Sequence, residues 1–557
     1  MSTEATSPQP DWSGVYAELG LQEPPYDDSP AAAHVERHAS ERPDAPAMAF
    51  GPKAYTFAEF DKAARCLATG LAAQGIGKGD VIGLHMPNIP QYMVALAAIS
   101  RLGAIGSGLS PLLAPPELAY QIQDAGMKAV IGLSDLAPAM AKMDPPDCLK
   151  LVIQTGALDH LGGPAHELTH IGQTQTLRYL DLLDNAGDAP QTPVAPDDVF
   201  MIQYTGGTTG RPKGAMLTVR SLMHNFMQAS AADPEFIAGE EVLATSFPMF
   251  HIAGLTFALC AMRVGALFFC LPNPRDVEAF VTLMKAHPPT RLAAVPAFYE
   301  MLLATPGADE VDYSGLHVIK TGAAPMAGST RDKLIELMGP GKMADVFGMT
   351  ETSPCYLVHP RNRYKPGAVG IPMPGADVRI ADVEDRDRLL GPGEAGEIIS
   401  AGVHVMKGYL NLPEETDRAL RTLNGQRYMY SGDVGYMDEE GYVYLCDRAK
   451  DMLIVGGFKV FSVEVEDKLK ALPVVGECAV IGYPDRDRPG NEVVNLRTIC
   501  LFEADFNSEN GEMGRKSMAK AEQHGTLPAE NYGGRKDHSA ADKGVNKALT
   551  DGQLRLM

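Results

Sequence analysis

The stretch YTGGTTGRPKG, residues 204–214, carries the strongest structural signal in this chain. It follows the apolar run VFMIQ and precedes GAML, so it is expected to be a glycine-rich loop between two strands. Glycines let backbone N–H groups turn toward one point, threonine hydroxyls add donors, and Lys213 adds a positive charge. This combination is typical of a loop that cradles phosphate groups, formed here by Thr205, Gly206, Gly207, Thr208, Thr209, Gly210 and Lys213.

The loop differs from a Walker phosphate-binding loop in several respects. Its glycine-to-lysine spacing is different, Pro212 precedes the lysine, and the residues that follow resemble a strand rather than a helix. The structural alternative is a flexible Gly/Thr hairpin that binds no ligand.

Alternating strand and helix signals surround the loop. The apolar run AMAF (47–50) precedes Thr56, and Glu59 completes a capping box ahead of apolar residues at helical spacing. The run VIGL (81–84) and the helix-like segment 90–105 continue the pattern. The alternation predicts an α/β fold in which helices are wound on parallel sheets.

Further along the chain the pattern changes twice. Strand-like runs with frequent Gly and Pro between about 365 and 446 predict a mostly β subdomain. Beyond Asp447, the segments DMLIVGG and VGECAVIGYPD and a helix expected around 463–472 indicate a small α+β domain. The expected organisation is one large domain over residues 1–446 and a small C-terminal domain over residues 447–557.

Charge and composition exclude several classes of function. The chain of 557 residues has 48 Lys plus Arg against 70 Asp plus Glu, a net charge of −22 that argues against a nucleic-acid partner. Its eight scattered cysteines lack a Cys-x-x-Cys pair, so no zinc site or disulfide framework is expected and a reducing compartment fits. No signal peptide is evident, and the apolar stretch 252–271 contains Arg263, so we expect buried core there and a cytoplasmic protein.

Four further segments contain side chains suited to binding a nucleotide: TGAAPM (321–326), FGMTET (347–352), YSGDVG (430–435) and DRAKDMLIVGGFKV (447–460). Asp433 can accept two hydrogen bonds from a vicinal diol, Phe347 offers a π face to a purine, and Glu351 is a hard oxygen ligand suited to Mg²⁺. Taken singly, each has a structural alternative: a turn residue, a core aromatic and a solvated surface acid.

Together with the loop, these segments resemble the motifs of the adenylate-forming (AMP-binding) superfamily, which includes acyl-CoA synthetases, luciferases and peptide-synthetase adenylation domains. The resemblance covers roughly residues 30–494 and implies ATP, Mg²⁺ and coenzyme A as cofactors or co-substrates. It implies a large N-terminal domain of doubly wound sheets with a β subdomain, followed by a small mobile α+β domain.

The resemblance also implies a role for each matching position. The phosphate loop and Thr350 would contact phosphates, Glu351 would hold magnesium, and Lys213, Thr350 and Glu351 would be catalytic. Lys450 matches the hinge between the two domains. The remaining nucleotide-binding positions are Gly322, Ala323, Ala324, Phe347, Gly348, Asp433 and Arg448.

The segment PMFHIAG (248–254) matches the wall of the acyl pocket and supplies His251, Ile252 and Gly254. Peptide-synthetase domains place an Asp there to pair with a substrate ammonium group. This segment offers no carboxylate to a buried cation, so an amino-acid substrate is disfavoured. His251 has two interpretations, a gating or orienting group beside the substrate carboxylate and a satisfied structural histidine.

The expected function is an ATP-dependent acid–thiol ligase that activates a medium- or long-chain fatty acid through acyl-AMP and transfers it to coenzyme A. Two alternatives are an aryl or short-branched-acid CoA ligase, and a catalytically impaired nucleotide- or acyl-binding homologue. The expected partners are a small-molecule carboxylic acid, ATP and CoA, without nucleic acid. The resemblance leaves open a homodimer and at most peripheral membrane contact.

The end of the chain departs from the family pattern. From about residue 495 strand-forming residues nearly vanish, and residues 501–557 contain one Val and no Ile. Members of the superfamily end with a short lysine-bearing motif; the best match here, SAADKGVNKAL, places Lys543 at the catalytic position and Asp542 where Gly is usual. Because an acid beside the lysine would compete with a phosphate, the impaired homologue stays as an alternative.

Overall fold

The structure is a computed structural model that describes most of the chain from residue 12 to residue 448. Within that span it leaves out residues 189–190, 207–210, 232, 234–236, 238, 323, 325 and 362, and beyond it describes only 453–455, 458–460, 462, 465–466, 483–484 and 492–493. Several predicted positions therefore lie outside the described residues: Gly207, Thr208, Thr209, Gly210, Ala323, Lys450 and Lys543. The helix expected around 463–472 and the tail from about 495 lie largely or wholly outside them too.

The first sheet has eight strands in the order β19-β9-β8-β4-β3-β5-β6-β7, and the strands from β8 to β7 are parallel. β9 and β19 extend it as antiparallel strands at one edge. The strands are β3 Val81–His85, β4 Ile105–Gly108, β5 Met127–Leu133, β6 Leu151–Thr155, β7 Gln175–Arg178, β8 Val199–Thr205, β9 Lys213–Thr218 and β19 Gly408–Tyr409.

The second sheet has six strands in the order β13-β12-β10-β11-β1-β2, of which only β2 pairs antiparallel. Its strand β1 is the predicted AMAF run. The strands are β1 Pro46–Phe50, β2 Lys53–Thr56, β10 Val242–Thr245, β11 Leu267–Phe269, β12 Arg291–Ala294 and β13 Val318–Thr321.

The third sheet is antiparallel and contains the predicted β subdomain. Its strand order is β14-β15-β16-β22-β21-β18-β17, and β20 pairs with β21. The strands are β14 Val346–Gly348, β15 Cys355–Val358, β16 Ala368–Pro372, β17 Asp377–Ala381, β18 Gly396–Ala401, β20 Leu420–Leu423, β21 Gln426–Met437 and β22 Val443–Arg448. Two short hairpins follow, β23 Leu453–Val455 with β24 Phe458–Val460, and β25 Tyr483–Pro484 with β26 Glu492–Val493.

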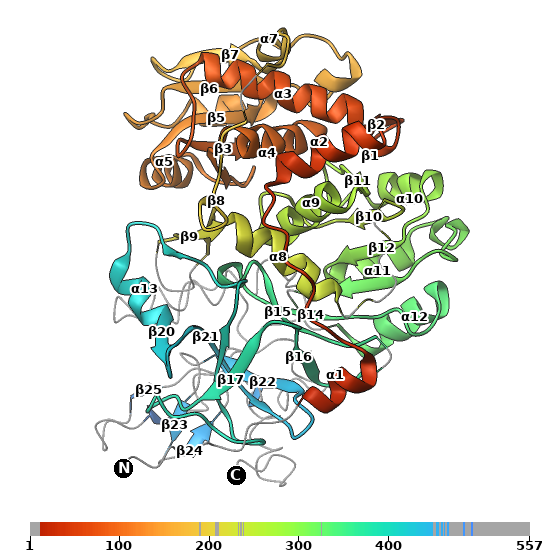
Figure 1. Cartoon of the computed structure of the whole chain (residues 1–557), viewed down its shortest axis with the longest axis vertical. Helices are drawn as coiled ribbons and strands as arrows, with labels where there is room; N and C mark the ends of the chain where they lie inside the picture. Colours follow the sequence, from red (N-terminus) through yellow and green to blue (C-terminus); the bar gives the residue numbers. More distant parts are fainter. Residues whose placement is uncertain are drawn as a thin grey trace, which may run out of the picture.

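Helices cover both faces of the first two sheets, which confirms the predicted doubly wound α/β fold (Figure 1). A single cluster of buried side chains joins the two sheets through α3, α4, α8 and α9, while α10 to α12 cover the outer face of the second sheet. The helices are α1 Ser13–Leu19, α2 Ala31–Glu41, α3 Phe57–Ala73, α4 Pro90–Leu102, α5 Pro115–Asp124, α6 Ala137–Met140, α7 Tyr179–Leu183, α8 Val219–Ser230, α9 Ile252–Val264, α10 Val277–Ala286, α11 Pro296–Ala304, α12 Gly328–Met338 and α13 Pro413–Ala419.

Local signals in the sequence fix the ends of these helices. The predicted capping box is present at the start of α3, where the Glu59 amide donates to Thr56 Oγ1 at 3.2 Å and the Thr56 amide donates to Glu59 Oε2 at 2.9 Å. α9 is the predicted core stretch, and its Arg263 is buried and donates to the Met223 carbonyl at 2.6 Å. Among the residues described, no helix is long and apolar enough to cross a membrane.

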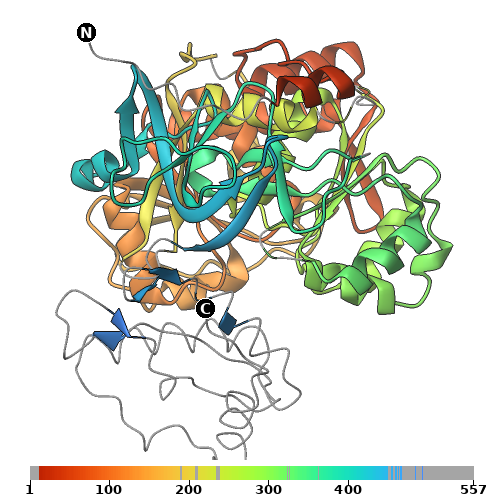
Figure 2. The ribbon, with the colours of Figure 1, turned by 90° about the horizontal axis from the view of Figure 1, so that it is seen from below.

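The three sheets meet at one place. Seen from below, the blue-green strands of the third sheet cross in front of the region where the orange and green segments of the other two sheets adjoin (Figure 2). β19 belongs to the chain segment between β18 and β20 of the third sheet, yet it pairs with β9 of the first. This crossing segment brings residues far apart in sequence to the edge of a single cavity.

Candidate active site

A cavity of about 1100 Å³ lies at this meeting point. It is bounded by the β8–β9 hairpin, by α8 and α9, by the ends of β13 and β14, by β19 and α13, and by β21 and β22. Eleven of the predicted site residues line it: Thr205, Gly206, Lys213, His251, Ile252, Gly322, Phe347, Gly348, Thr350, Glu351 and Arg448. Three other described predictions do not: Gly254, Ala324 and Asp433.

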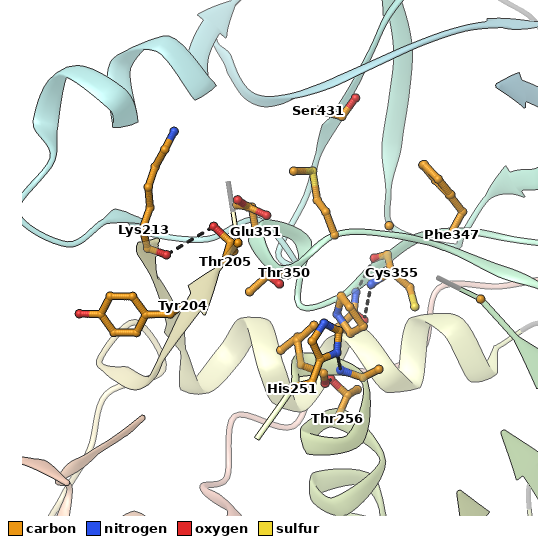
Figure 3. A pocket seen from close by; sticks show the side chains of 18 of the residues that line it. Tyr204, Thr205, Lys213, His251, Thr256, Phe347, Thr350, Glu351, Cys355 and Ser431 are labelled. Atoms are coloured by element: carbon orange, nitrogen blue, oxygen red, sulfur yellow. Dashed lines mark hydrogen bonds between the residues drawn. The ribbon is translucent and has the colours of Figure 1, made fainter. Parts of the chain in front are cut away.

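Lys213 is placed by the hairpin that contains the glycine-rich loop. The loop connects β8 to β9, so Thr205 and Lys213 face each other across the ladder, and Thr205 Oγ1 donates to the Lys213 carbonyl at 3.4 Å. The Lys213 ammonium lies 4.9 Å from the centre of the Tyr409 ring and donates to Glu415 Oε2 at 2.7 Å. Figure 3 shows this side chain extending toward the cyan helix α13.

Glu351 lies in the one-turn 3₁₀ helix Thr350–Thr352 and is only 5% exposed. Its Oε1 accepts a hydrogen bond from the Tyr409 hydroxyl at 2.7 Å, and its backbone carbonyl accepts from the Met406 amide at 2.8 Å. Burial raises the pKa of Glu351 above its ordinary value, and the Tyr409 hydroxyl and the Lys213 charge oppose that rise. The Tyr409 hydroxyl and the Lys213 charge therefore both favour the ionised carboxylate.

The turn that carries Glu351 is held by α8. Asn225 is fully buried on that helix, and its Nδ2 donates to the carbonyls of Thr352 at 3.2 Å and Cys355 at 2.6 Å. Its Oδ1 accepts from the Cys355 amide at 3.1 Å. An amide side chain that satisfies three backbone groups fixes the turn more firmly than apolar packing alone would.

Tyr409 and Glu415 were not predicted as site residues. Tyr409 comes to the cavity because Gly408 pairs with Met216 and Tyr409 with Ala215, and two further backbone bonds to the Met216 and Gly214 carbonyls flank this pairing. The pairing joins positions almost 200 residues apart, and neither spacing nor periodicity within the chain signals it. The one local signal for the pairing strand is the Gly408–Tyr409 dipeptide, which follows an irregular stretch of the chain.

Phe347 stands at the opposite side of the cavity from Lys213, with Thr350 and Glu351 between them (Figure 3). Its ring is partly exposed and packs edge-on against Tyr356, with ring centroids 5.6 Å apart. Gly348 follows it where the chain passes very close to itself, since a Cβ there would lie 1.9 Å from the Pro354 carbonyl oxygen. The partly exposed ring of Phe347 therefore lies beside Gly348, a position with no room for a side chain.

Asp433 and Arg448 face each other across β21 and β22. Arg448 Nε lies 3.0 Å from Asp433 Oδ1, and Arg448, the more exposed of the two, reaches the cavity wall together with Ser431 and Gly432. Burial raises the pKa of Asp433, and the Arg448 guanidinium opposes the rise. Asp433 therefore lies directly behind the cavity wall, attached to it by its ion pair with Arg448.

The other arm of the cavity lies between α8 and α9. His251 caps α9, where its Nδ1 accepts from the Ala253 amide at 3.3 Å, and its ring faces the open cavity. The protein around the ring lowers the pKa of His251, which favours neutral imidazole.

The aromatic side chains Phe226, Phe257 and Phe247 follow one another along this arm, with centroid separations of 5.5 and 6.4 Å. Gly254 lies on the inner side of α9, where a Cβ would lie 2.2 Å from the Pro248 carbonyl oxygen, so it serves packing.

A buried ionic cluster reaches this arm through Lys320. Lys320 Nζ lies 3.0 Å from Asp233 Oδ2 and 5.7 Å from the Phe226 ring centre, and the residue is on the cavity wall. Arg291 lies 3.1 Å from both Asp233 and Glu241. Two cations and two acids balance one another, so the cluster adds polarity to the arm without net charge.

The described residues fit a magnesium ion that enters with a polyphosphate. Nowhere among them do three or more His, Cys, Asp or Glu side chains gather as a metal-binding group. Glu351 supplies a single buried carboxylate on the cavity wall, and Mg²⁺ is commonly held by one or two carboxylates together with substrate phosphates.

Comparison with known proteins agrees with this geometry. Residues 35–410 match the AMP-binding enzyme family. The chain is 32% identical over 472 residues to a long-chain-fatty-acid–CoA ligase of Escherichia coli O157:H7, covering 81% of this chain and 82% of the relative. It is 33% identical over 453 residues to a feruloyl-CoA synthase of an Amycolatopsis species, covering 81% and 84% respectively.

Solved structures share the fold. A long-chain-fatty-acid–CoA ligase from Archaeoglobus fulgidus superposes with a TM-score of 0.68 at 26% identity, covering 84% of this chain and 91% of that one. O-succinylbenzoate coenzyme A synthetase from Bacillus subtilis, solved with AMP, gives 0.66 at 25% identity and covers 82% and 86%. The chain belongs to the AMP-binding enzyme family. Its relatives confirm the predicted enzyme class, an acid–thiol ligase.

Replacing Tyr409 with Phe is expected to raise the pKa of Glu351, because the buried carboxylate loses its hydroxyl donor. The acid limb of the pH profile of ATP–pyrophosphate exchange should then move upward by about one pH unit. Tyr204→Phe is the matched control, since the Tyr204 hydroxyl also lies at the cavity but donates to Asp124. An acid limb that moves equally in both variants, or in neither, would contradict this role of Tyr409.

Proposed function

We propose that this protein is an ATP- and Mg²⁺-dependent acyl-CoA synthetase that activates a carboxylic acid as acyl-AMP and transfers it to coenzyme A. The observation that carries the proposal is that one cavity joins a charged end, with Lys213 and Glu351, to an aromatic arm with Phe226 and Phe257. A nucleotide polyphosphate suits the first and an acyl group suits the second.

The nucleotide would lie across the charged end. Lys213 and the N–H groups of the glycine-rich loop, including Gly207, Thr208, Thr209 and Gly210, would hold the phosphates together with Thr205, Gly206 and Thr350. Phe347, Gly348, Gly322, Ala323 and Ala324 would flank the adenine. Asp433 and Arg448 would contact the ribose, since a carboxylate and a guanidinium can accept from and donate to its two hydroxyls. Phe347 and Lys213 lie on opposite sides of the cavity, which supports the adenine at one side and the phosphates at the other (Figure 3).

The first chemical step needs no side-chain nucleophile. A substrate carboxylate oxygen attacks the α-phosphorus of ATP, the new P–O bond forms as the bond to the β-phosphate oxygen breaks, and pyrophosphate leaves. Negative charge grows on oxygens that are already negative, so Lys213 would act by electrostatic stabilisation. Bound at Glu351, Mg²⁺ would neutralise part of the phosphate charge. His251 would orient the substrate carboxylate as a neutral hydrogen-bonding group.

In the second step the coenzyme A thiolate attacks the acyl carbon and AMP leaves, and the thiol proton passes to solvent. We assign residues 1–446 to an adenylation domain and 447–557 to a small domain that rotates between the steps, with Lys450 as the hinge and Lys543 as the lysine that reaches the acyl phosphate. The strand β22 of the third sheet ends at Arg448, two residues beyond this boundary.

We propose a medium- or long-chain fatty acid as the substrate. The apolar and aromatic lining of the α8–α9 arm supports this choice, as does the similarity to long-chain-fatty-acid–CoA ligases. A second candidate is an aryl acid, because Lys320 places a polar group on the wall of the same arm and a feruloyl-CoA synthase is among the relatives. An alkyl chain has no hydrogen-bond acceptor for the Lys320 ammonium, whereas an oxygen substituent on an aromatic ring can accept a hydrogen bond from it.

A panel of straight-chain fatty acids, hydroxycinnamic acids and benzoic acids, assayed for CoA-dependent AMP formation, tests the proposal. We expect the highest kcat/KM with fatty acids. Higher values with hydroxycinnamic acids would select the aryl alternative. No AMP formation with any acid would contradict the enzyme and leave the binding homologue.

Lys213→Ala is expected to slow acyl-AMP formation by about 10²- to 10³-fold, the size of one lost transition-state donor. The measurement is acid-dependent ATP–pyrophosphate exchange. Lys78→Ala is the matched control, because Lys78 is half-exposed and pairs with Asp198 outside the cavity. A loss of less than about threefold in Lys213→Ala would remove this lysine from the reaction.

A further inference from the structure

Glu415 on α13 forms a contact that the proposed chemistry does not use. Its Oε2 accepts from Lys213 Nζ at 2.7 Å, and its Oε1 accepts from Arg418 at 2.5 Å. Both Lys213 and Glu415 line the cavity, at 31% and 30% exposure of their side chains. The loop lysine is thus held at the phosphate end of the cavity by an acid from a distant segment.

We propose that Glu415 is a positioning residue that holds the Lys213 ammonium while no polyphosphate is bound and competes with the nucleotide for it. This inference rests on the proposed function, in which Lys213 binds ATP phosphates. Lys213 would pass from one carboxylate oxygen to a phosphate oxygen when ATP enters, and return when pyrophosphate leaves.

The geometry makes this exchange easy. A partly exposed ion pair is weak, because solvent screens it, so a polyphosphate with several negative charges can displace the carboxylate. Glu415 would not be left unpaired, since its other oxygen stays with Arg418, three residues along the same helix. The buried Glu351 has no such freedom, because its carboxylate is fixed by Tyr409.

Lys213 also keeps a support when Glu415 is absent. Its ammonium lies over the Tyr409 ring, and a cation in that position is attracted by the ring face. Removing the Glu415 charge should therefore free the lysine for phosphate without releasing the side chain into solvent. Glu415 would then affect nucleotide affinity mainly by competing with the phosphates for Lys213, and less by holding the lysine in place before the nucleotide binds.

Glu415→Gln in the full-length chain tests the inference, with ATP binding followed by calorimetry and kinetics measured beside it. The expected result is about two- to fivefold tighter ATP binding, with KM for ATP falling in parallel and kcat changing less than twofold. The gain should shrink at high salt, because screening weakens the competing pair. A purely structural role of Glu415 would not produce this split between KM and kcat.

Glu414→Gln is the matched control. Glu414 precedes Glu415 on α13, its side chain is 89% exposed, and its recorded ionic partner is Arg418 at 3.9 Å. An equal gain in ATP affinity in both variants would mean that the loss of one negative charge causes the effect, and it would overturn the inference. Unchanged or weaker ATP binding in Glu415→Gln, beside a wild type that binds ATP, would overturn it while leaving the proposed function intact. A wild type that binds no ATP would overturn both.

Discussion

The buried carboxylate of Glu351, held by the Tyr409 hydroxyl, is the constraint on which the rest of the site depends. A carboxylate removed from water must find donors or lose its charge, and here the donor comes from another part of the chain. Tyr409 is in place only when β19 pairs with β9, and Glu351 only when its turn is fixed by Asn225 of α8. The contact therefore forms only when the first sheet, α8 and the third-sheet connection have all assembled.

The same pairing organises the charged end of the cavity. β9 begins at Lys213, so the β19–β9 ladder that delivers Tyr409 to Glu351 also sets Tyr409 beneath the lysine ammonium and α13 beside it. Opposite charges meet here in two environments. Glu351 is buried and hydrogen-bonded to Tyr409, whereas Glu415 is partly exposed and shared with a second cation. One carboxylate suits a metal ion and the other suits a lysine that must change partners.

The sequence predicted the elements whose signals are local. The capping box at Thr56, the strands on both sides of the glycine-rich loop and the buried core stretch after His251 depend on neighbouring residues, and the structure confirms them. The nucleotide-binding segments were found because each keeps its residue types within a few positions, and eleven of the predicted residues do line one cavity.

What the sequence could not predict depends on contacts between distant segments. Tyr409 reaches the cavity through the β19–β9 pairing, and Glu415 through its contact with Lys213, and no spacing in the chain predicts either. Gly254 was expected to line the acyl arm, but it lies against the Pro248 carbonyl because a helix turns only part of its surface toward a cavity. Asp433 was expected to contact the nucleotide; the structure pairs it with Arg448, which lines the cavity, and its contact with the ribose stays a prediction.

Linkage between magnesium and nucleotide at Glu351 tests the central claim most directly. ATP affinity would be measured by calorimetry with and without Mg²⁺ for the wild type and for Glu351→Gln, which keeps the shape of the side chain. If Glu351 is the buried carboxylate that receives the ion, Mg²⁺ should tighten ATP binding to the wild type by at least about tenfold and to the variant far less. An equal gain from Mg²⁺ in both proteins would contradict the account.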